Sequence, residues 1–336
     1  MIIALKKDAK LKDIDALTDA LLEADFTFET VQGQHYTVLH ILGDTTAFDG
    51  KKLYAYDCVD RIINIQEPFI RAHKKNHPNK TIITIGDVAF GSNTPVIIAG
   101  PCSVENHSQI MAIAKAVKAS GANILRGGAY KPRTSPYAFQ GLKEEGLQLL
   151  HDAAKTYNLK TISEIVAKED LPYFDKYIDI IQVGARNMQN FDLLKALGKA
   201  KQPILLKRGF GNTIEEWLMS AEYIMNHGNN NVILCERGIR TFEGYTRTTL
   251  DISSILAVKQ LSHLPVIVDP SHAAGRWELV EGLSKASIAA GADGLMIEVH
   301  NAPKRALSDG AQSLKLDKFQ TLMNDLTALM TAIKKT

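Results

Sequence analysis

The feature that most constrains the fold is a repeating unit that begins near residue 81 and continues towards the C-terminus. Each unit contains a short β-branched run, a loop and an apolar pattern of helical period. Near-continuous apolar strands that alternate with helices indicate a parallel sheet covered by helices on its outer face. The expected strands are 95–100, 123–128, 161–166, 179–184, 203–209, 232–238, 265–270 and 294–299.

Eight such units in about 250 residues are typical of an α/β fold, the closed (β/α)8 TIM barrel. An open dinucleotide-binding sheet is disfavoured, because no Gly-x-Gly-x-x-Gly pattern follows the first strand. Residues 81–90 are expected to form a hairpin at the lower end of the barrel. A Thr and a Glu three residues apart, Thr213 and Glu216, predict a capping box at the start of one helix.

The first 66 residues have a different pattern, which predicts a small ferredoxin-like α+β domain of order βαββαβ. Its expected elements are strand 2–5, helix 11–24, strands 26–31 and 36–42, a weak helix 46–54 and strand 61–65. Residues 67–80 include a polar run that ends in proline and are expected to be a linker. The catalytic barrel is then expected to span 81–336.

Charge and composition limit the partners of the protein. Lys and Arg number 39 and Asp and Glu 37, so the net charge of +2 favours neither nucleic acid nor a membrane surface as a partner. No apolar run reaches the roughly 18 residues of a membrane span, and the N-terminus lacks the pattern of a secretory signal. Three widely spaced cysteines, Cys58, Cys102 and Cys235, fit a reducing compartment, so we expect a cytoplasmic protein.

Polar and charged residues lie at the ends of nearly all the expected strands, where a β/α-barrel builds its active site. In chain order they are Cys102, Arg126, Glu164, Arg186, Lys207 with Arg208, Glu236 with Arg237, His272 and Glu298. Charges within apolar strands are costly unless they are paired or face a ligand. Their recurrence at equivalent positions therefore predicts a functional site.

These residues form two chemical sets. Thiolate, imidazole and carboxylate groups could surround a divalent cation; they are Cys102, His272, Glu298 and Asp309. A ring of cations suits a small substrate with phosphate and carboxylate groups; it contains Arg126, Lys131, Arg133, Arg186, Lys207 and Arg237. Structural alternatives are a buried apolar role for Cys102, helix capping by His272, a plain loop role for Asp309 and structural ion pairs for Glu164 and Glu298.

Seven ordered motifs within residues 81–315 resemble those of the 3-deoxy-D-arabino-heptulosonate 7-phosphate (DAHP) synthases. They are Ile98-Ala-Gly-Pro-Cys102-Ser, Arg126-Gly-Gly-Ala-Tyr-Lys131-Pro-Arg133-Thr134-Ser-Pro, Gly184-Ala185-Arg186-Asn, Leu206-Lys207-Arg-Gly, Glu236-Arg237-Gly, Asp269-Pro-Ser-His272 and Met296-Ile-Glu298-Val. The related 3-deoxy-D-manno-octulosonate 8-phosphate synthases have a Lys-Ala-Asn-Arg stretch in place of Lys131-Pro-Arg133-Thr134. The motifs therefore favour a DAHP synthase.

The resemblance implies that Cys102, His272, Glu298 and Asp309 hold the metal, commonly Mn²⁺, although Fe²⁺, Co²⁺ or Zn²⁺ would also suit the ligands. It implies that phosphoenolpyruvate is bound by Arg126, Lys131, Ala185, Arg186, Lys207 and Arg237. Arg133 and Thr134 would bind the phosphate of the aldose, and Glu164 would help to place a water. Lys131 is the expected proton donor.

The resemblance also implies a reaction: phosphoenolpyruvate, erythrose 4-phosphate and water give DAHP and phosphate, the first step of the shikimate pathway. The first domain resembles a regulatory extension that senses an aromatic amino acid, tyrosine or phenylalanine, with a structural or oligomerising role as its alternative. A homotetramer or homodimer is expected. The rival functions are an octulosonate synthase, a Schiff-base aldolase using Lys131 or Lys207, and a non-catalytic aromatic amino acid sensor.

Overall fold

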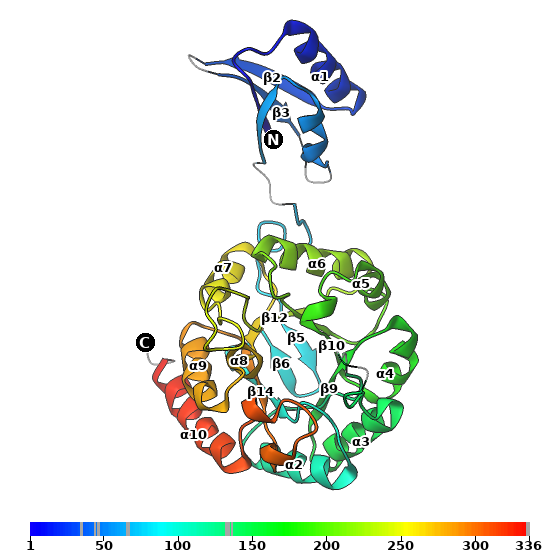
Figure 1. The fold of residues 1–336 in the computed structure, drawn as a ribbon, viewed down its shortest axis with the longest axis vertical. Helices are drawn as coiled ribbons and strands as arrows, with labels where there is room; N and C mark the ends of the chain where they lie inside the picture. The colour runs from blue at the N-terminus through cyan, green and yellow to red at the C-terminus, as the bar shows by residue number, and fades with distance from the viewer. Residues whose placement is uncertain are drawn as a thin grey trace. The chain divides into compact units, whose positions relative to one another are not determined.

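The computed structural model describes residues 1–333 except 34–35, 44, 46–47, 65–67, 132–134 and 136. The chain divides into two compact units, Met1–Ile70 and Arg71–Thr336 (Figure 1). Residues 71–80, part of the expected linker, pack within the second unit, where the backbone N–H groups of Arg71 and Ala72 both donate to the Glu222 carboxylate at 2.9 Å. In the described parts of the chain, no helix is long and apolar enough to cross a membrane.

In its described residues, the first unit is a four-stranded antiparallel sheet of order β2-β3-β1-β4 with one α-helix and one 3-10 helix. Its elements are β1 (Ile2–Leu5), α1 (Leu11–Glu23), β2 (Thr27–Gln32), β3 (Thr37–Leu42), η1 (Gly50–Ala55) and β4 (Val59–Ile63). Leu17 and Leu21, one turn apart on α1, are fully buried in the same cluster as Ile3 and Leu39 of the sheet. The predicted ferredoxin-like fold is confirmed.

One expected element of this unit differs in the structure. The weak helix expected near 46–54 is the six-residue 3-10 helix η1, whose N-cap Asp49 accepts the N–H of Lys51. Residues 46–47 of that expected helix, and residue 65 of the expected last strand, lie outside the described residues. A helix this short fits a segment with little helical periodicity.

The second unit is a closed barrel of parallel strands in the order β10-β11-β12-β13-β14-β7-β8-β9, as predicted. The strands are β7 (Val96–Gly100), β8 (Ile124–Arg126), β9 (Lys160–Ile165), β10 (Ile180–Val183), β11 (Ile204–Lys207), β12 (Val232–Glu236), β13 (Val266–Val268) and β14 (Gly294–Glu298). The helices are α2 (His107–Ala119), α3 (Lys143–Thr156), α4 (Leu171–Tyr177), α5 (Phe191–Leu197), α6 (Ile214–Asn226), α7 (Ser253–Leu261), α8 (Pro270–Ala274), α9 (Trp277–Ala289) and α10 (Leu316–Ile333). Figure 1 shows the helices as a ring around the strands.

The strands are buried on both faces, which explains why their sequences are almost continuously apolar. Every residue of β7, β12 and β14 is buried. Alternate side chains such as Ile98 and Met296 point into the barrel interior, where they belong to one apolar cluster. The helices bury apolar side chains on the outer side of the strands; on α2 these are Ile110, Ile113 and Val117.

A short hairpin closes the lower end of the barrel. It consists of β5 (Ile83–Ile85) and β6 (Val88–Phe90), within the region where a hairpin was predicted. Ile83, Val88 and Phe90 are buried in the cluster that also contains the residues at the starts of three barrel strands, for example Val96. Ligands can therefore reach the barrel from the C-terminal ends of the strands, opposite the hairpin.

The predicted capping box is present at the start of α6. Thr213 Oγ1 accepts the N–H of Glu216 at 3.1 Å, and the Glu216 carboxylate accepts the N–H of Thr213 at 2.9 Å. We expect Thr213→Ala to lower the free energy of unfolding by about 1 kcal/mol, because the backbone N–H of Glu216 loses its acceptor, the Thr213 hydroxyl. Urea denaturation measures the change. Thr321→Ala, on the exposed face of α10, is the control; equal midpoints for the two variants would contradict the prediction.

Candidate active site

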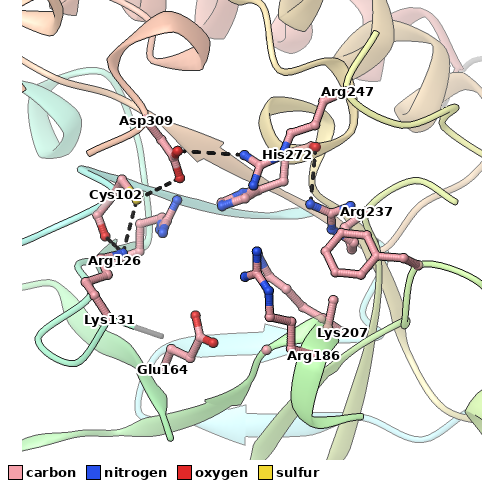
Figure 2. A pocket seen from close by; sticks show the side chains of 13 residues that line it. Cys102, Arg126, Lys131, Glu164, Arg186, Lys207, Arg237, Arg247, His272 and Asp309 are labelled. Carbon is pink, nitrogen blue, oxygen red and sulfur yellow. Dashed lines mark hydrogen bonds and ion pairs between the residues drawn. The ribbon is translucent and has the colours of Figure 1, made fainter. Parts of the chain in front are cut away.

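A cavity of about 260 Å³ opens at the C-terminal ends of the strands (Figure 2). The predicted site residues in its lining are Cys102, Arg126, Lys131, Glu164, Ala185, Arg186, Lys207, Arg237, His272 and Asp309. Glu298 is fully buried just behind this wall, in contact with Arg126 and His272. Arg133 and Thr134 lie outside the described residues. The barrel thus brings together residues that are up to 207 positions apart in the chain.

Three possible metal ligands meet on one side of the cavity. The Cys102 thiol and the carboxylates of Glu298 and Asp309 offer atoms that all lie within 4.8 Å of one another. Cys102 Sγ is 3.2 Å from Asp309 Oδ2, and His272 Nε2 is 3.4 Å from Glu298 Oε1. The imidazole therefore lies beside the group of three.

The chemistry of this set fits a divalent cation. Burial, and after it the charge of Glu298, raises the pKa of the Cys102 thiol to about 11. Burial also lowers the pKa of His272, which favours the neutral imidazole that can coordinate a metal. The buried carboxylate of Glu298 and the partly buried carboxylate of Asp309 repel one another beside the thiol, and a bound cation would relieve that repulsion and favour the thiolate. Mixed sulfur, nitrogen and oxygen ligands suit first-row transition metals.

Local backbone conformations place two of these ligands. Gly100 ends β7 with a φ of +152°, and a Cβ there would lie 2.1 Å from the carbonyl oxygen of Arg126, so only glycine allows the chain to turn towards Cys102. Asp309 has a φ of 48°, in the left-handed region that aspartate tolerates better than most residues. The loop that bears Asp309 returns to the barrel through a parallel bridge between Val299 and Leu314.

Asp269 is a buried residue that contacts two residues of the cavity, Lys207 and His272. Its buried carboxylate lies 2.5 Å from Lys207 Nζ and 2.7 Å from His272 Nδ1, and it caps α8 by accepting the N–H of His272 at 2.9 Å. Burial alone would raise the pKa of Asp269, but the charges of His272 and Lys207 lower it well below its usual value. Asp269, rather than His272, caps the helix, so the imidazole is left facing the cavity.

Glu298 takes part in an ion pair as well as lying next to the possible metal ligands. Arg126 Nη1 is 2.6 Å from Glu298 Oε1, and both side chains are buried. Gln312 Nε2 donates to Glu298 Oε2 at 2.8 Å, and Arg247 Nη1 donates to Gln312 Oε1 at 3.0 Å. The structural alternative for Glu298 is thus present together with the placement expected of a ligand.

Cationic side chains line the rest of the cavity: Lys131 lies next to Cys102, and Arg186 and Arg237 lie farther from it. Lys131 Nζ donates to the Cys102 carbonyl at 2.5 Å and lies 3.1 Å from its sulfur. Within the described residues, Arg186 and Arg237 form no ion pair, although the guanidinium of Arg237 donates to the His272 carbonyl at 3.3 Å. Glu164 projects into the cavity and accepts from Gln182 at 3.2 Å. Two guanidinium groups are therefore available to an anion.

Four residues of the site were not assigned to it from the sequence. Asp269 begins the motif Asp269-Pro-Ser-His272 at the end of an expected strand, so its sequence position could have indicated that it belongs to the site. Arg247 and Phe210 come from loops and Gln312 from a short 3-10 helix (Gly310–Gln312), and no local sequence pattern marks any of the three. Arg208, by contrast, lies outside the cavity lining and pairs with Glu236 at 3.0 Å and Asp251 at 2.8 Å.

A (β/α)8 barrel with a cavity that combines a thiol, an imidazole and carboxylates with unpaired guanidinium groups defines an enzyme that acts on small anionic substrates. The chain belongs to the DAHP synthetase I family, whose model matches residues 70–335. A second model, the DAHP synthase ferredoxin-like domain, matches residues 1–67. The family resemblance found in the motifs, and the prediction of an enzyme of this family, are confirmed.

Similar proteins agree with this assignment. A phospho-2-dehydro-3-deoxyheptonate aldolase of Thermotoga maritima is 47% identical over 333 residues, which cover 99% of this chain and 98% of the relative. A crystal structure of a phospho-2-dehydro-3-deoxyheptonate aldolase (DAHP synthase) from Thermotoga maritima, 47% identical in sequence, has a TM-score of 0.95 and covers 99% of this chain and 97% of the crystallised chain. A 2-dehydro-3-deoxyphosphooctonate aldolase of Syntrophotalea carbinolica is 32% identical over 273 residues, or 75% of this chain and 97% of the relative.

Proposed function

We propose that this protein condenses phosphoenolpyruvate with erythrose 4-phosphate and water to give DAHP and phosphate, the first step of the shikimate pathway. The observation that supports it best is one cavity in which Cys102 and Asp309, with Glu298 directly behind them, share the lining with Arg186 and Arg237, which have no carboxylate partner among the described residues. Such a cavity has a place for a cation and a place for an anion side by side. Membership of the DAHP synthetase I family supports the same reaction.

Cys102, His272, Glu298 and Asp309 would hold the divalent cation, which we propose to be Mn²⁺, with Fe²⁺, Co²⁺ and Zn²⁺ as alternatives. When bound, it would supply Lewis acidity for the aldehyde of erythrose 4-phosphate. Asp269 fixes the orientation of His272 from the side away from the cavity.

The remaining residues bind and orient the substrates. The proposed phosphoenolpyruvate site consists of Arg126, Lys131, Ala185, Arg186, Lys207 and Arg237. Guanidinium groups match carboxylate and phosphate oxygens bidentately, so this set can hold C3 of phosphoenolpyruvate against the aldehyde carbon. Arg133 and Thr134 are proposed to bind the phosphate of the aldose.

The proposed reaction forms a carbon–carbon bond at C3 and a carbon–oxygen bond between water and C2, and it breaks the carbon–oxygen bond between C2 and phosphate. C3 of phosphoenolpyruvate bonds to the aldehyde carbon, and Lys131 donates a proton to the oxygen that becomes the new hydroxyl. Glu164, which accepts a hydrogen bond from Gln182, orients the water whose oxygen bonds to C2. The resulting hemiketal phosphate then loses inorganic phosphate and leaves the C2 ketone. The water gives up two protons in these steps: one replaces the proton donated by Lys131, and the other leaves with the phosphate.

Phosphate release from phosphoenolpyruvate tests this function. We expect purified protein supplied with Mn²⁺ to release phosphate with erythrose 4-phosphate, and a chelator to stop the reaction because the cation is removed. Arabinose 5-phosphate should support little or no release. Turnover with the pentose alone would assign the octulosonate synthase reaction, the alternative supported by the 32% identical relative. Undiminished turnover after complete metal removal would contradict the proposed role of Cys102 and its neighbours.

We further propose that the first unit binds an aromatic amino acid, tyrosine or phenylalanine, and that binding inhibits the barrel. Its match to the DAHP synthase ferredoxin-like domain supports an effector role. The proposed assembly is a homotetramer or homodimer in the cytoplasm. Phosphate release measured with each amino acid in turn tests the regulation, and light scattering measures the assembly. Unchanged rates with both amino acids would leave the unit with a structural role, and a protein that never turns over would favour the sensor alternative.

A further inference from the structure

Phe210 lies in the loop between β11 and α6, and its partly buried side chain lines the cavity. Three guanidinium groups lie close to this one ring. The distances from the guanidinium carbon to the ring centroid are 4.4 Å for Arg237, 5.2 Å for Arg240 and 5.6 Å for Arg186. All three are within the range in which the face of an aromatic ring attracts a cation.

The backbone of this loop is tied to the loops that bear the arginines. The N–H of Gly209 donates to the sulfur of Met188 at 3.1 Å, and Met188 is buried two residues after Arg186. On the other side, the N–H of Arg240 donates to the Phe210 carbonyl at 2.7 Å. The backbone that bears the ring is therefore held relative to both loops.

Arg186 and Arg237 come from two different strand ends and need to point into the same cavity (Figure 2). Their long side chains lose rotamer freedom when they are held in one orientation. A carboxylate could hold them, as Glu298 holds Arg126 at 2.6 Å, but it would also compete with a bound anion. An aromatic ring attracts a guanidinium group and leaves its positive charge and its N–H donors available.

We infer that Phe210 is a positioning residue that holds Arg186 and Arg237 in the orientation that binds the anionic groups of phosphoenolpyruvate. The inference rests on the proposed function, in which these two arginines contact that substrate. Arg240 is exposed and packs near the same ring, which places it at the outer side of the group. Phe210 itself needs no contact with the reacting atoms.

The inference predicts a selective kinetic effect. We expect Phe210→Leu, which keeps an apolar side chain but removes the ring, to raise the KM for phosphoenolpyruvate about tenfold, a magnitude estimated from the strength of cation–π contacts. The kcat and the KM for erythrose 4-phosphate should change much less. Phe210→Trp restores an aromatic face and should recover most of the lost affinity. Binding of phosphoenolpyruvate alone, measured by calorimetry, should follow the same order.

Phe191→Leu is the matched control. Phe191 is also partly exposed and stacks on another ring, that of Tyr223, with centroids 4.4 Å apart, but it does not line the cavity. This variant should keep the wild-type KM for phosphoenolpyruvate. An equal rise in both variants would show a general loss of packing and would overturn the positioning role of Phe210.

Failure of the inference and failure of the proposed function give different results. If the unmodified protein neither binds nor turns over phosphoenolpyruvate, the proposed function is wrong. If it does both, and Phe210→Leu keeps the wild-type KM, the function stands and the positioning role is wrong. A lowered kcat with an unchanged KM, or a loss that Phe210→Trp does not recover, would also overturn the positioning role.

Discussion

Replacement of Cys102 by serine is expected to lower the rate of phosphate release about a thousandfold and to remove the bound divalent cation. The thiol lies 3.2 Å from Asp309 and within 4.8 Å of Glu298, in the set of atoms that would hold the metal. A serine hydroxyl is a harder and much weaker ligand than a thiolate. Loss of several kcal/mol of transition-state stabilisation by the cation corresponds to a factor of this size.

Metal content by elemental analysis and phosphate release should both be measured on each preparation. Cys58→Ala, in the first unit, is the control because Cys58 is also a buried free thiol but belongs to the other core cluster. This variant should keep both the metal and the activity. A Cys102→Ser protein that retains the metal at full occupancy and turns over at the normal rate would exclude Cys102 as a ligand.

Removal of the Asp269 carboxylate is expected to have the largest effect on stability. Asp269→Ala should lower the free energy of unfolding of the metal-free protein by about 3–5 kcal/mol, because it leaves the buried ammonium of Lys207 without its partner at 2.5 Å. It also removes the cap of α8 and the carboxylate beside His272. Urea denaturation in the presence of chelator measures the change without a contribution from bound metal.

The exposed pair Lys168–Asp192, also 2.5 Å apart, provides the comparison. Asp192→Ala removes a carboxylate from a similar distance, but both partners are in contact with solvent, so stability should change little. If the two variants lose similar stability, then burial of the Lys207–Asp269 pair does not have the effect argued here.

The strands of the barrel were predictable because burial on both faces leaves almost no freedom in composition. The first strand was expected at 95–100 and is observed at Val96–Gly100. The seventh was expected at 265–270 but ends at Val268, because Asp269 caps α8 and Pro270 has no N–H to continue the ladder. Sequence patterns thus located each strand, whereas its last residues depended on the helix that follows.

The site was predictable only in part. Residues at strand ends could be identified because closure of the barrel brings those ends together. Neighbouring residues at a strand end face opposite sides, so Lys207 lines the cavity while Arg208 pairs with Glu236 behind it. Phe210 and Gln312 could not have been identified, because their roles depend on tertiary contacts, that of Phe210 with Arg237 and that of Gln312 with Glu298, which no local pattern indicates.

The order of the barrel strands has a consequence for how the chain folds during synthesis. β7 pairs with β8 on one side and with β14 on the other, and Gly100 is paired with Glu298. When β7 leaves the ribosome, its second neighbour has not yet been made, and at bacterial and eukaryotic translation rates the wait is roughly 10–40 s. During that time β7 presents an apolar, unpaired edge, so cellular yield should depend on how well the nascent chain is protected until its last strand emerges.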